Sequence, residues 1–368
     1  MEPVLIVFLV VAGIQLFYYA VLFARVGFIH TSSFVSEQLP PASVVICARN
    51  EAENLKRFLK VVLIQQYPQF EVILVNDRST DNTIDVIVDY YTRNTNVRVV
   101  NIPVGEKSDY AGKKDALMKG IELARFETIV VTDADCRPAS TQWLAQLVSS
   151  YGSNTDIVLG YSPFEKAKGF VQKLIRYENF MTAMQYLGFA KAGMPYMGTG
   201  RNMSYRKALF NASDAFTRNK DLPTGDDDLF INSVAKGGNT EVCLSKSAFT
   251  YTMAPATFKE WLSQKQRHLR SGFRYRMHHK LLLFILPLAT MLFYILFPVL
   301  VVKGIMVNIV CAVFAATLVL KLLLSYNVYS KLDAEDLRFL SPVLDVFFIG
   351  YLLIVFFLIL LKPKNNWK

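Results

Sequence analysis

Long apolar segments at both ends of the chain constrain its fold more than any other feature. Residues 3–26, 281–324 and 339–361 are apolar apart from a few isolated polar side chains. Because about 20 apolar residues span a bilayer, these lengths predict one transmembrane helix at the N-terminal end and about three at the C-terminal end. The first segment has no basic residues before it and exceeds the apolar part of a signal peptide. We therefore expect residues 1–27 to be a membrane anchor.

Basic residues beside the apolar segments predict the orientation of the chain. Arg25 follows the first segment, and a basic cluster precedes the second: Lys265, Arg267, Arg270, Arg274, Arg276 and Lys280. Such residues mark the cytoplasmic side and attract anionic lipid, so the formal charge of +10 indicates a membrane partner and no nucleic acid. We expect a multi-pass protein of the cell (inner) membrane with a cytoplasmic middle section. Four complete spans would place Lys362 and Lys364 outside, so one C-terminal segment is a candidate re-entrant or interfacial helix.

The middle section has the pattern of one α/β domain, residues 38–254. Apolar runs bounded by polar turns predict strands at 43–48, 72–76, 97–102, 128–132 and 156–161, and helical spacing predicts helices at 52–63 and 84–91. Alternating strands and helices favour a mainly parallel sheet, with ligands beyond the carboxyl ends of the strands.

Residues 255–279 follow this domain and have the pattern of an amphipathic interfacial helix. Trp261, Leu269, Phe273 and Met277 recur at multiples of four, and we expect them to face lipid. Residues 280–368 then form the C-terminal transmembrane region.

Two aspartates directly follow the apolar run 128–131. Side chains two apart on an extended segment point the same way, so Asp133 and Asp135 can present two carboxylates to one cation. Mg²⁺ or Mn²⁺ held between carboxylates and substrate phosphates is a common arrangement in diphosphate chemistry. The alternative is a solvated acidic turn.

Two further clusters suit a nucleotide. Asp77 ends a predicted strand, where it could accept hydrogen bonds from a base or ribose, and helix capping does not account for it. Lys113 lies at a helix start, where the helix dipole and an ammonium group together favour phosphate. This second signal is weak alone, because surface lysines are common.

Three consecutive acids, Asp226, Asp227 and Asp228, form the last acidic signal. They repel one another, so at least one pKa should rise unless a cation lies near. A raised carboxylate pKa suits a general base working near neutral pH. Farther along, Gln264 and Arg267 lie three apart on the predicted amphipathic helix and share a face, which a purely lipid-surface helix does not explain.

These positions together resemble the family-two inverting glycosyltransferases of the GT-A fold, the group that contains cellulose, hyaluronan and chitin synthases. The resemblance runs from Pro41 to about His268, with apolar helices on both sides. It implies an α/β GT-A nucleotide-sugar-binding domain flanked by transmembrane helices. The implied nucleotide-sugar-binding residues are Ala48, Asn50, Glu51, Asp77, Lys113 and Asp133, with Asp133 and Asp135 as ligands of Mg²⁺ or Mn²⁺.

The resemblance also implies catalytic and acceptor residues. Asp226, three residues before Leu229, matches the family's catalytic base, and Asp227 is the alternative if the register shifts by one. Arg267 matches the arginine that neutralises the departing diphosphate. The implied acceptor or product site contains Gly200, Asn202, Gln264 and His268. Two positions depart from the pattern: Gly225 replaces a glutamate, and His268 replaces a tryptophan.

The implied function is metal-assisted transfer of a sugar, with inversion, from a nucleotide sugar to a lipid-linked or glycan acceptor. A UDP-sugar is the expected donor. The smaller imidazole of His268 predicts a lipid-linked sugar or short glycan, while a processive polysaccharide synthase is the alternative. The alternatives from other functional classes are a non-catalytic membrane scaffold and a dinucleotide-dependent membrane oxidoreductase. The oxidoreductase would need a Gly-x-Gly-x-x-Gly motif after the first strand, where Cys47–Asn50 has no glycine.

Overall fold

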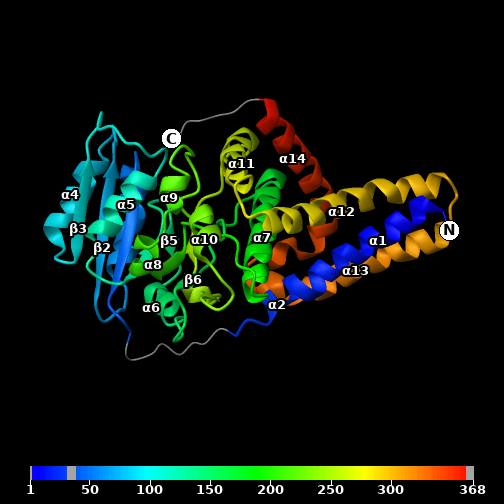
Figure 1. Ribbon diagram of the computed structural model, residues 1–368, viewed down its shortest axis with the longest axis horizontal. Coiled ribbons are helices and arrows are strands. Elements are labelled where there is room, and N and C mark those ends of the chain that lie inside the picture. Colours follow the sequence, from blue (N-terminus) through cyan, green and yellow to red (C-terminus); the bar gives the residue numbers. More distant parts are fainter. Residues whose placement is uncertain (1, 31–38, 362–368) are drawn as a thin grey trace.

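The computed structural model describes residues 2–30 and 39–361. The predicted boundary at residue 38 and the basic residues Lys362 and Lys364 therefore lie outside the described residues. The centre of the middle section is a seven-stranded sheet in the order β3-β2-β1-β4-β7-β6-β8 (Figure 1). Its strands are β1 (Ala42–Ala48), β2 (Phe70–Asp77), β3 (Val97–Ile102), β4 (Thr128–Val131), β6 (Ile157–Leu159), β7 (Met203–Arg206) and β8 (Thr240–Val242).

The sheet is mostly parallel, as predicted. Only β7 runs antiparallel to its neighbours, β4 and β6, while β3, β2, β1 and β4 pair in parallel. Every residue of β1 and β4 is buried, as expected for strands covered on both faces. The strand order reverses between β1 and β4, and open α/β sheets bind ligands at such a reversal.

Helices connect the strands and cover the sheet. The prediction for 52–63 is confirmed by α3 (Ala52–Leu63), and the one for 84–91 by the slightly longer α4 (Thr83–Arg93). The other elements of the middle section are α5 (Lys114–Leu123), α6 (Trp143–Val148), α7 (Phe170–Lys191), α8 (Lys207–Asn211), α9 (Ala215–Arg218), α10 (Asp228–Val234), η2 (Lys246–Ala248), and the two-stranded sheet of β5 (Arg137–Pro138) and β9 (Thr250–Tyr251).

Within the described residues, four helices are long and apolar enough to cross a membrane, one before the sheet domain and three after it, as predicted. These spans are Pro3–Gly27, Met277–Val302, Val307–Lys331 and Glu335–Val355. They comprise α1 (Pro3–Phe17) with its continuation η1 (Tyr18–Phe23) and α2 (Ala24–Gly27), then α12 (Met277–Val302), α13 (Val307–Lys331), η3 (Glu335–Leu340) and α14 (Ser341–Leu361).

A tight turn between α12 and α13 allows both helices to reach full length. Gly304 has φ +69° and Met306 has φ +43°, so the chain reverses over residues 303–306. The left-handed conformation suits glycine, which has no Cβ.

The four apolar helices do not all lie in one bundle. Helices α1, α12 and α13 run side by side, whereas α14 runs across their direction beside α7 and α11 (Figure 1). A buried ion pair of 2.6 Å joins Lys321 of α13 to Asp345 of α14, and Tyr177 of α7 donates a hydrogen bond of 2.5 Å to the same carboxylate. Because a buried charge is costly unless it is paired, these contacts fix the start of α14 against both the bundle and the sheet domain.

The amphipathic segment differs in part from the prediction. It forms α11 (Phe258–Gly272), which ends before residue 279 because α12 already begins at Met277. Leu269, Phe273 and Met277 are exposed as expected, but Trp261 is fully buried. Its ring stacks on Tyr351 of α14 at 3.9 Å between centroids. The prediction that Trp261 faces lipid was therefore wrong, since α14 covers that face of α11.

Candidate active site

A cavity of about 380 Å³ lies between the carboxyl ends of β1 and β4 and the helices beside the bundle. The loops after β1 and β4, the start of α5, the acidic run and the residues around Gly200 line one end. Helices α7, α11 and α14 line the other, with Tyr351 and Leu352 coming from α14. One cavity therefore joins the strand ends to an apolar helix that packs against the membrane bundle.

The two aspartates after β4 lie at the strand end of this cavity. Ligand atoms of Asp133, Asp135 and Cys136 all fall within 4.8 Å of one another. Burial and the Asp133 carboxylate raise the pKa of Asp135. A bound divalent cation would relieve the repulsion between these two carboxylates, and paired carboxylate oxygens suit Mg²⁺ or Mn²⁺. A thiol is a soft ligand, so Cys136 is not needed for a hard cation. The residues present fit the predicted metal.

The two lysines at the start of α5 have different contacts. Lys113 lines the cavity and forms an ion pair with Asp133. Burial alone would lower the pKa of Lys113, but Asp133 and Asp226 outweigh it and raise that pKa well above its usual value. Lys114 is fully buried and points elsewhere, donating hydrogen bonds of 2.5 and 2.6 Å to the carbonyl oxygens of Leu222 and Thr224. It thereby holds the loop that leads into the acidic run.

The three consecutive aspartates differ in their hydrogen-bond partners. Asp227 accepts hydrogen bonds from the backbone N–H groups of Gly200 (2.8 Å) and Asp228 (2.7 Å). Asp228, at the start of α10, accepts hydrogen bonds from the hydroxyls of Ser271 and Tyr275. Asp226 lines the cavity, and its carboxylate accepts no hydrogen bond from any described residue. Asp226 is therefore the member of the run that is most available to a substrate.

The predicted repulsion among these acids is present. Burial and the two neighbouring carboxylates raise the pKa of Asp227 to about 8. Burial also raises the pKa of Asp228, although its hydroxyl partners oppose that shift. Both groups are occupied by fixed partners, which favours a structural role for Asp227 over its alternative role as base.

Helix α11 supplies Gln264, Arg267 and His268 to the cavity wall. Desolvation together with the charges of Lys265 and Arg267 lowers the pKa of His268, so its imidazole is neutral near pH 7. Part of the basic cluster predicted to face lipid is instead used within the protein. Lys265 pairs with Glu178 at 2.7 Å, and Arg274 pairs with Asp221 at 2.5 Å.

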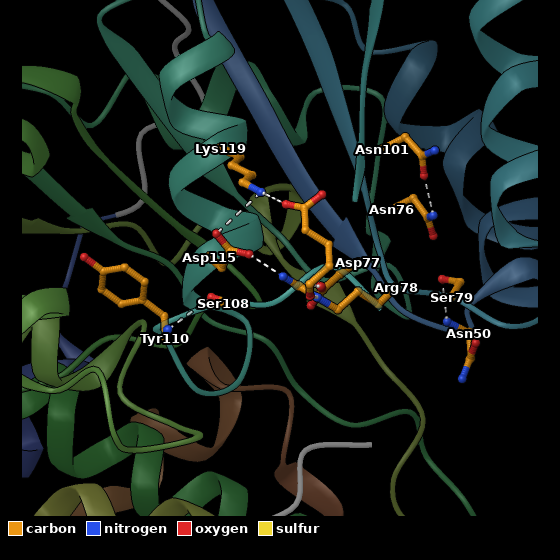
Figure 2. Close-up of polar contacts among 11 residues, drawn as sticks. Asn50, Asn76, Asp77, Arg78, Ser79, Asn101, Ser108, Tyr110, Asp115 and Lys119 are labelled. Carbon is orange, nitrogen blue, oxygen red and sulfur yellow. Dashed lines mark hydrogen bonds and ion pairs between the residues drawn. The ribbon is translucent and has the colours of Figure 1, made fainter. Parts of the chain in front are cut away.

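Asp77 lies at the end of β2, within a polar network beside the cavity (Figure 2). Arg78 pairs with both Asp77 and Asp115, and Lys119 lies 3.8 Å from Asp115. Asp77 is buried, which raises its pKa. Its Oδ2 atom is buried without a hydrogen-bond partner among the described residues. A buried acceptor of this kind is costly unless a ligand supplies a donor.

The loop residues predicted to bind the nucleotide have mixed positions. Glu51 lines the cavity. The Asn50 side-chain oxygen instead accepts a hydrogen bond of 2.8 Å from the Thr80 backbone N–H, and the Asn50 backbone N–H donates to Ser79 Oγ at 3.0 Å. Asn50 therefore connects the loop after β1 to the loop after β2. Ala48 is buried at the end of β1.

Of the predicted acceptor residues, Asn202 does not fit its expected role. It is fully buried, its amide group donates to the carbonyls of Tyr161 and Ala248 at 2.8 Å each, and its Oδ1 accepts from Trp143. The side chain is thus committed to the fold, and it is not part of the cavity wall. Gly200, Gln264 and His268 do line the cavity.

Four positions in or beside the site were not predicted from the sequence: Arg78, Lys114, Glu178 and Tyr351. Lys114 directly follows Lys113, a predicted phosphate ligand. Only the direction in which each side chain leaves the start of α5 distinguishes the two lysines. Glu178 and Tyr351 come from α7 and α14, far from every motif, and no local pattern singles them out.

Residues 43–213 match the family model described as glycosyl transferase family 2. The chain carries a family 2 glycosyltransferase domain. The family match contains β1 from its second residue on, together with Asp77, Lys113 and the Asp133–Asp135 pair. The acidic run and α11 follow the end of the matched residues.

Curated relatives of this glycosyltransferase domain are similar over part of their length. A poly-beta-1,6-N-acetyl-D-glucosamine synthase from Staphylococcus epidermidis is 34% identical over 99 residues, which are 27% of this chain and 23% of that protein. Glycosyltransferase AglE of Haloferax volcanii is 32% identical over 154 residues, which are 41% of this chain and 48% of that protein. The chain thus aligns with less than half of the length of either relative.

Among solved structures, a mannosyltransferase resembles this chain over nearly its whole length. The mannosyltransferase PcManGT from Pyrobaculum calidifontis, in complex with GDP-Man and Mn²⁺, matches with a TM-score of 0.63 and 17% identity. The match covers 98% of this chain and 99% of that one. At this identity the likeness establishes the fold, which is the GT-A fold.

Proposed function

We propose that this protein transfers a sugar, with inversion, from a nucleoside diphosphate sugar to an acceptor at the cytoplasmic surface of a membrane. One observation carries the proposal: a single cavity contains the Asp133–Asp135 pair, Asp226 and Arg267, and a wall of that cavity comes from α14. The chemistry of diphosphate binding and a free carboxylate are thus brought together beside the membrane helices.

The proposed reaction is a single displacement at the anomeric carbon. Asp226 accepts the proton of the acceptor hydroxyl while the hydroxyl oxygen attacks that carbon. The bond to the diphosphate breaks, and Arg267 and Lys113 stabilise the negative charge that develops on the departing group. Asp133 and Asp135 would hold Mg²⁺ or Mn²⁺, which would supply further neutralisation of the diphosphate. Attack from the opposite side converts an α-linked donor to a β-linked product.

The donor is expected to be a nucleotide sugar whose base lies near Asp77. The unpartnered Asp77 Oδ2 atom can accept a hydrogen bond from the imide N–H of uracil, which supports a UDP-sugar. The mannosyltransferase with a similar fold holds GDP-Man and Mn²⁺, so guanosine donors belong in the same test.

A lipid-linked sugar or short glycan is the proposed product. The core of the α1–α12–α13 bundle is filled by stacked rings, with Phe8–Phe293 at 5.1 Å and Phe293–Phe314 at 5.0 Å. A packed core of this kind leaves no room for a polymer to cross through the bundle of one chain. The similarity to a poly-beta-1,6-N-acetyl-D-glucosamine synthase keeps the processive synthase as the second candidate.

Purified full-length protein in lipid nanodiscs, with Mn²⁺ and a panel of UDP- and GDP-sugars, provides the test. Mass spectrometry should detect hydrolysis of one donor and, with membrane lipid extract, a product one or a few sugars larger. Failure to bind or hydrolyse any donor would favour the scaffold class. Long polysaccharide made by the protein alone would favour the processive synthase.

A further inference from the structure

Tyr351 of α14 has an unusual place at the membrane-side end of the cavity. Its side chain is part of the cavity wall, yet Tyr351 is only 3% exposed. Its hydroxyl oxygen is buried without a hydrogen-bond partner among the described residues. A buried hydroxyl left without a partner is destabilising, so packing alone would favour phenylalanine here.

The ring of Tyr351 is held in place by α11. It stacks on Trp261 with 3.9 Å between centroids and 7° between planes, and Phe258 contacts Trp261 edge-on at 5.6 Å. Aromatic stacking of this kind fixes ring orientation. The hydroxyl therefore has a fixed direction, as required of a group that binds a ligand.

A second atom in the same cavity lacks a partner. Gln264 lines the cavity from α11, and its Oε1 atom is buried without a hydrogen-bond donor among the described residues. Glu178, from α7, adds a carboxylate to the wall, held by Lys265 at 2.7 Å and by the Thr182 hydroxyl at 2.9 Å. This end of the cavity thus offers two acceptor groups and one hydroxyl.

The chemistry of these groups selects the ligand. An amide oxygen and a carboxylate need hydrogen-bond donors, and a sugar supplies them through its hydroxyl groups. A lipid phosphate offers chiefly acceptors and would leave Gln264 Oε1 without a donor. We propose that Tyr351, Gln264 and Glu178 form an acceptor subsite that binds the hydroxyl groups of a sugar already attached to the acceptor.

This subsite rests on the proposed transferase function and specifies its acceptor class. Phe347, Leu353 and Ile354 on α14 are exposed and apolar, and the helix runs beside the bundle (Figure 1). A glycolipid in the adjacent leaflet can keep its chains in the bilayer while its sugar occupies the cavity that α11 and α14 both line. The acceptor is therefore a glycolipid, and a bare lipid phosphate is excluded.

The test compares two amphiphiles with the same alkyl chain. Full-length protein in nanodiscs is titrated with n-dodecyl glycosides of glucose, N-acetylglucosamine or mannose, and separately with n-dodecyl phosphate. Binding is followed by tryptophan emission, because Trp261 contacts Tyr351, and transfer by mass spectrometry with the active donor. Tyr351→Phe removes only the hydroxyl, and Tyr326→Phe is the matched control because Tyr326 is an exposed tyrosine on α13.

At least one glycoside should bind more tightly than the phosphate. In Tyr351→Phe its apparent Kd and KM should rise about three- to tenfold, as expected for one lost hydrogen bond, while donor KM and the Tyr326→Phe control stay unchanged. Tighter binding of n-dodecyl phosphate, no binding of any glycoside, or an unchanged Kd in Tyr351→Phe would overturn the subsite. Because the emission titration needs no donor, these results are independent of whether donor turnover fails, which would instead overturn the proposed transferase.

Discussion

The two ends of the cavity are built in different ways. At the proposed donor end, Asp133, Asp135 and Lys113 follow strands or begin a helix of the sheet domain, and their charges are strong and close together. At the proposed acceptor end, Glu178, Gln264 and Tyr351 come from three helices that are distant in sequence, and Glu178 is neutralised by Lys265. Charge concentrated at one end suits a metal and a diphosphate, while a nearly neutral, hydrogen-bonding end suits a sugar.

The largest expected effect is that of replacing Asp226, which lies between the two ends of the cavity. We expect Asp226→Asn to lower transfer by about 10²–10⁴-fold while the donor still binds, because only the proton acceptor is removed. Single-turnover transfer and donor calorimetry measure the two effects. The exposed Asp214→Asn is the control, since Asp214 pairs only with Arg218 in the structure. Near-normal turnover in Asp226→Asn would move the role of base to Asp227.

Arg267 and His268 are adjacent, and we expect substitutions at the two positions to affect different steps: the departing diphosphate at Arg267 and the acceptor at His268. Arg267→Ala should lower kcat by about 10²–10³-fold, typical of losing one group that stabilises developing negative charge. His268→Trp should keep transfer and lengthen the product, because a larger aromatic face holds an acceptor sugar better. Steady-state kinetics and product sizing check both. Equal loss of activity in the two variants would contradict the division of the cavity into two ends.

For the two predicted metal ligands, Asp133 and Asp135, the expected effect of substitution is on donor affinity. Asp135→Ala should weaken donor binding at least about tenfold, or about 1.4 kcal/mol, in the presence of Mn²⁺ and have little effect in its absence. Calorimetry with and without Mn²⁺ distinguishes the conditions. If affinity is unchanged in both, the two carboxylates form only an acidic turn.

Lys114 tests the stability of the proposed donor end, because it holds the loop before the acidic run without lining the cavity. Lys114→Met should lower the free energy of unfolding by about 1–3 kcal/mol, because the carbonyls of Leu222 and Thr224 lose a buried donor. Thermal unfolding in nanodiscs measures the change. Lys56→Met is the control, since Lys56 is exposed and pairs only with Glu53 in the structure. Equal stability in the two variants would show that the buried contacts of Lys114 are not stabilising.

The last prediction concerns how α14, which lines the proposed acceptor end, lies relative to the membrane. If α14 lies at the bilayer surface, as its direction across the bundle suggests, only α1, α12 and α13 span, and the C-terminus is cytoplasmic. A C-terminal fluorescent-protein fusion should then be fluorescent, and a C-terminal alkaline phosphatase fusion inactive. The opposite pair of results would indicate four complete spans.

Much of the donor end could be predicted from sequence. The strands β1, β2 and β4 are short buried runs followed at once by polar residues, so pattern alone placed Asp77, Asp133 and Asp135 at strand ends. The three acids at 226–228 were also recognised, and the predicted rise in pKa is present at Asp227 and Asp228. The resemblance favoured Asp226 as the base, with Asp227 as the alternative. The local pattern could not show which carboxylate lacks hydrogen-bond partners, because adjacent residues differ only in the direction that the start of α10 gives their side chains.

The sequence by itself determined the membrane helices, the α/β domain and the order of the charged motifs, because periodicity and strand-end position are local properties. Only the tertiary structure decided that Asn202 is a buried anchor, that Trp261 packs on α14 and faces no lipid, and that Lys114 supports a loop. It also decided that Tyr351, on the last helix, reaches the cavity of the preceding α/β domain. Such contacts depend on how α7, α11 and α14 pack together, and the local pattern of each helix carries no information about its neighbours.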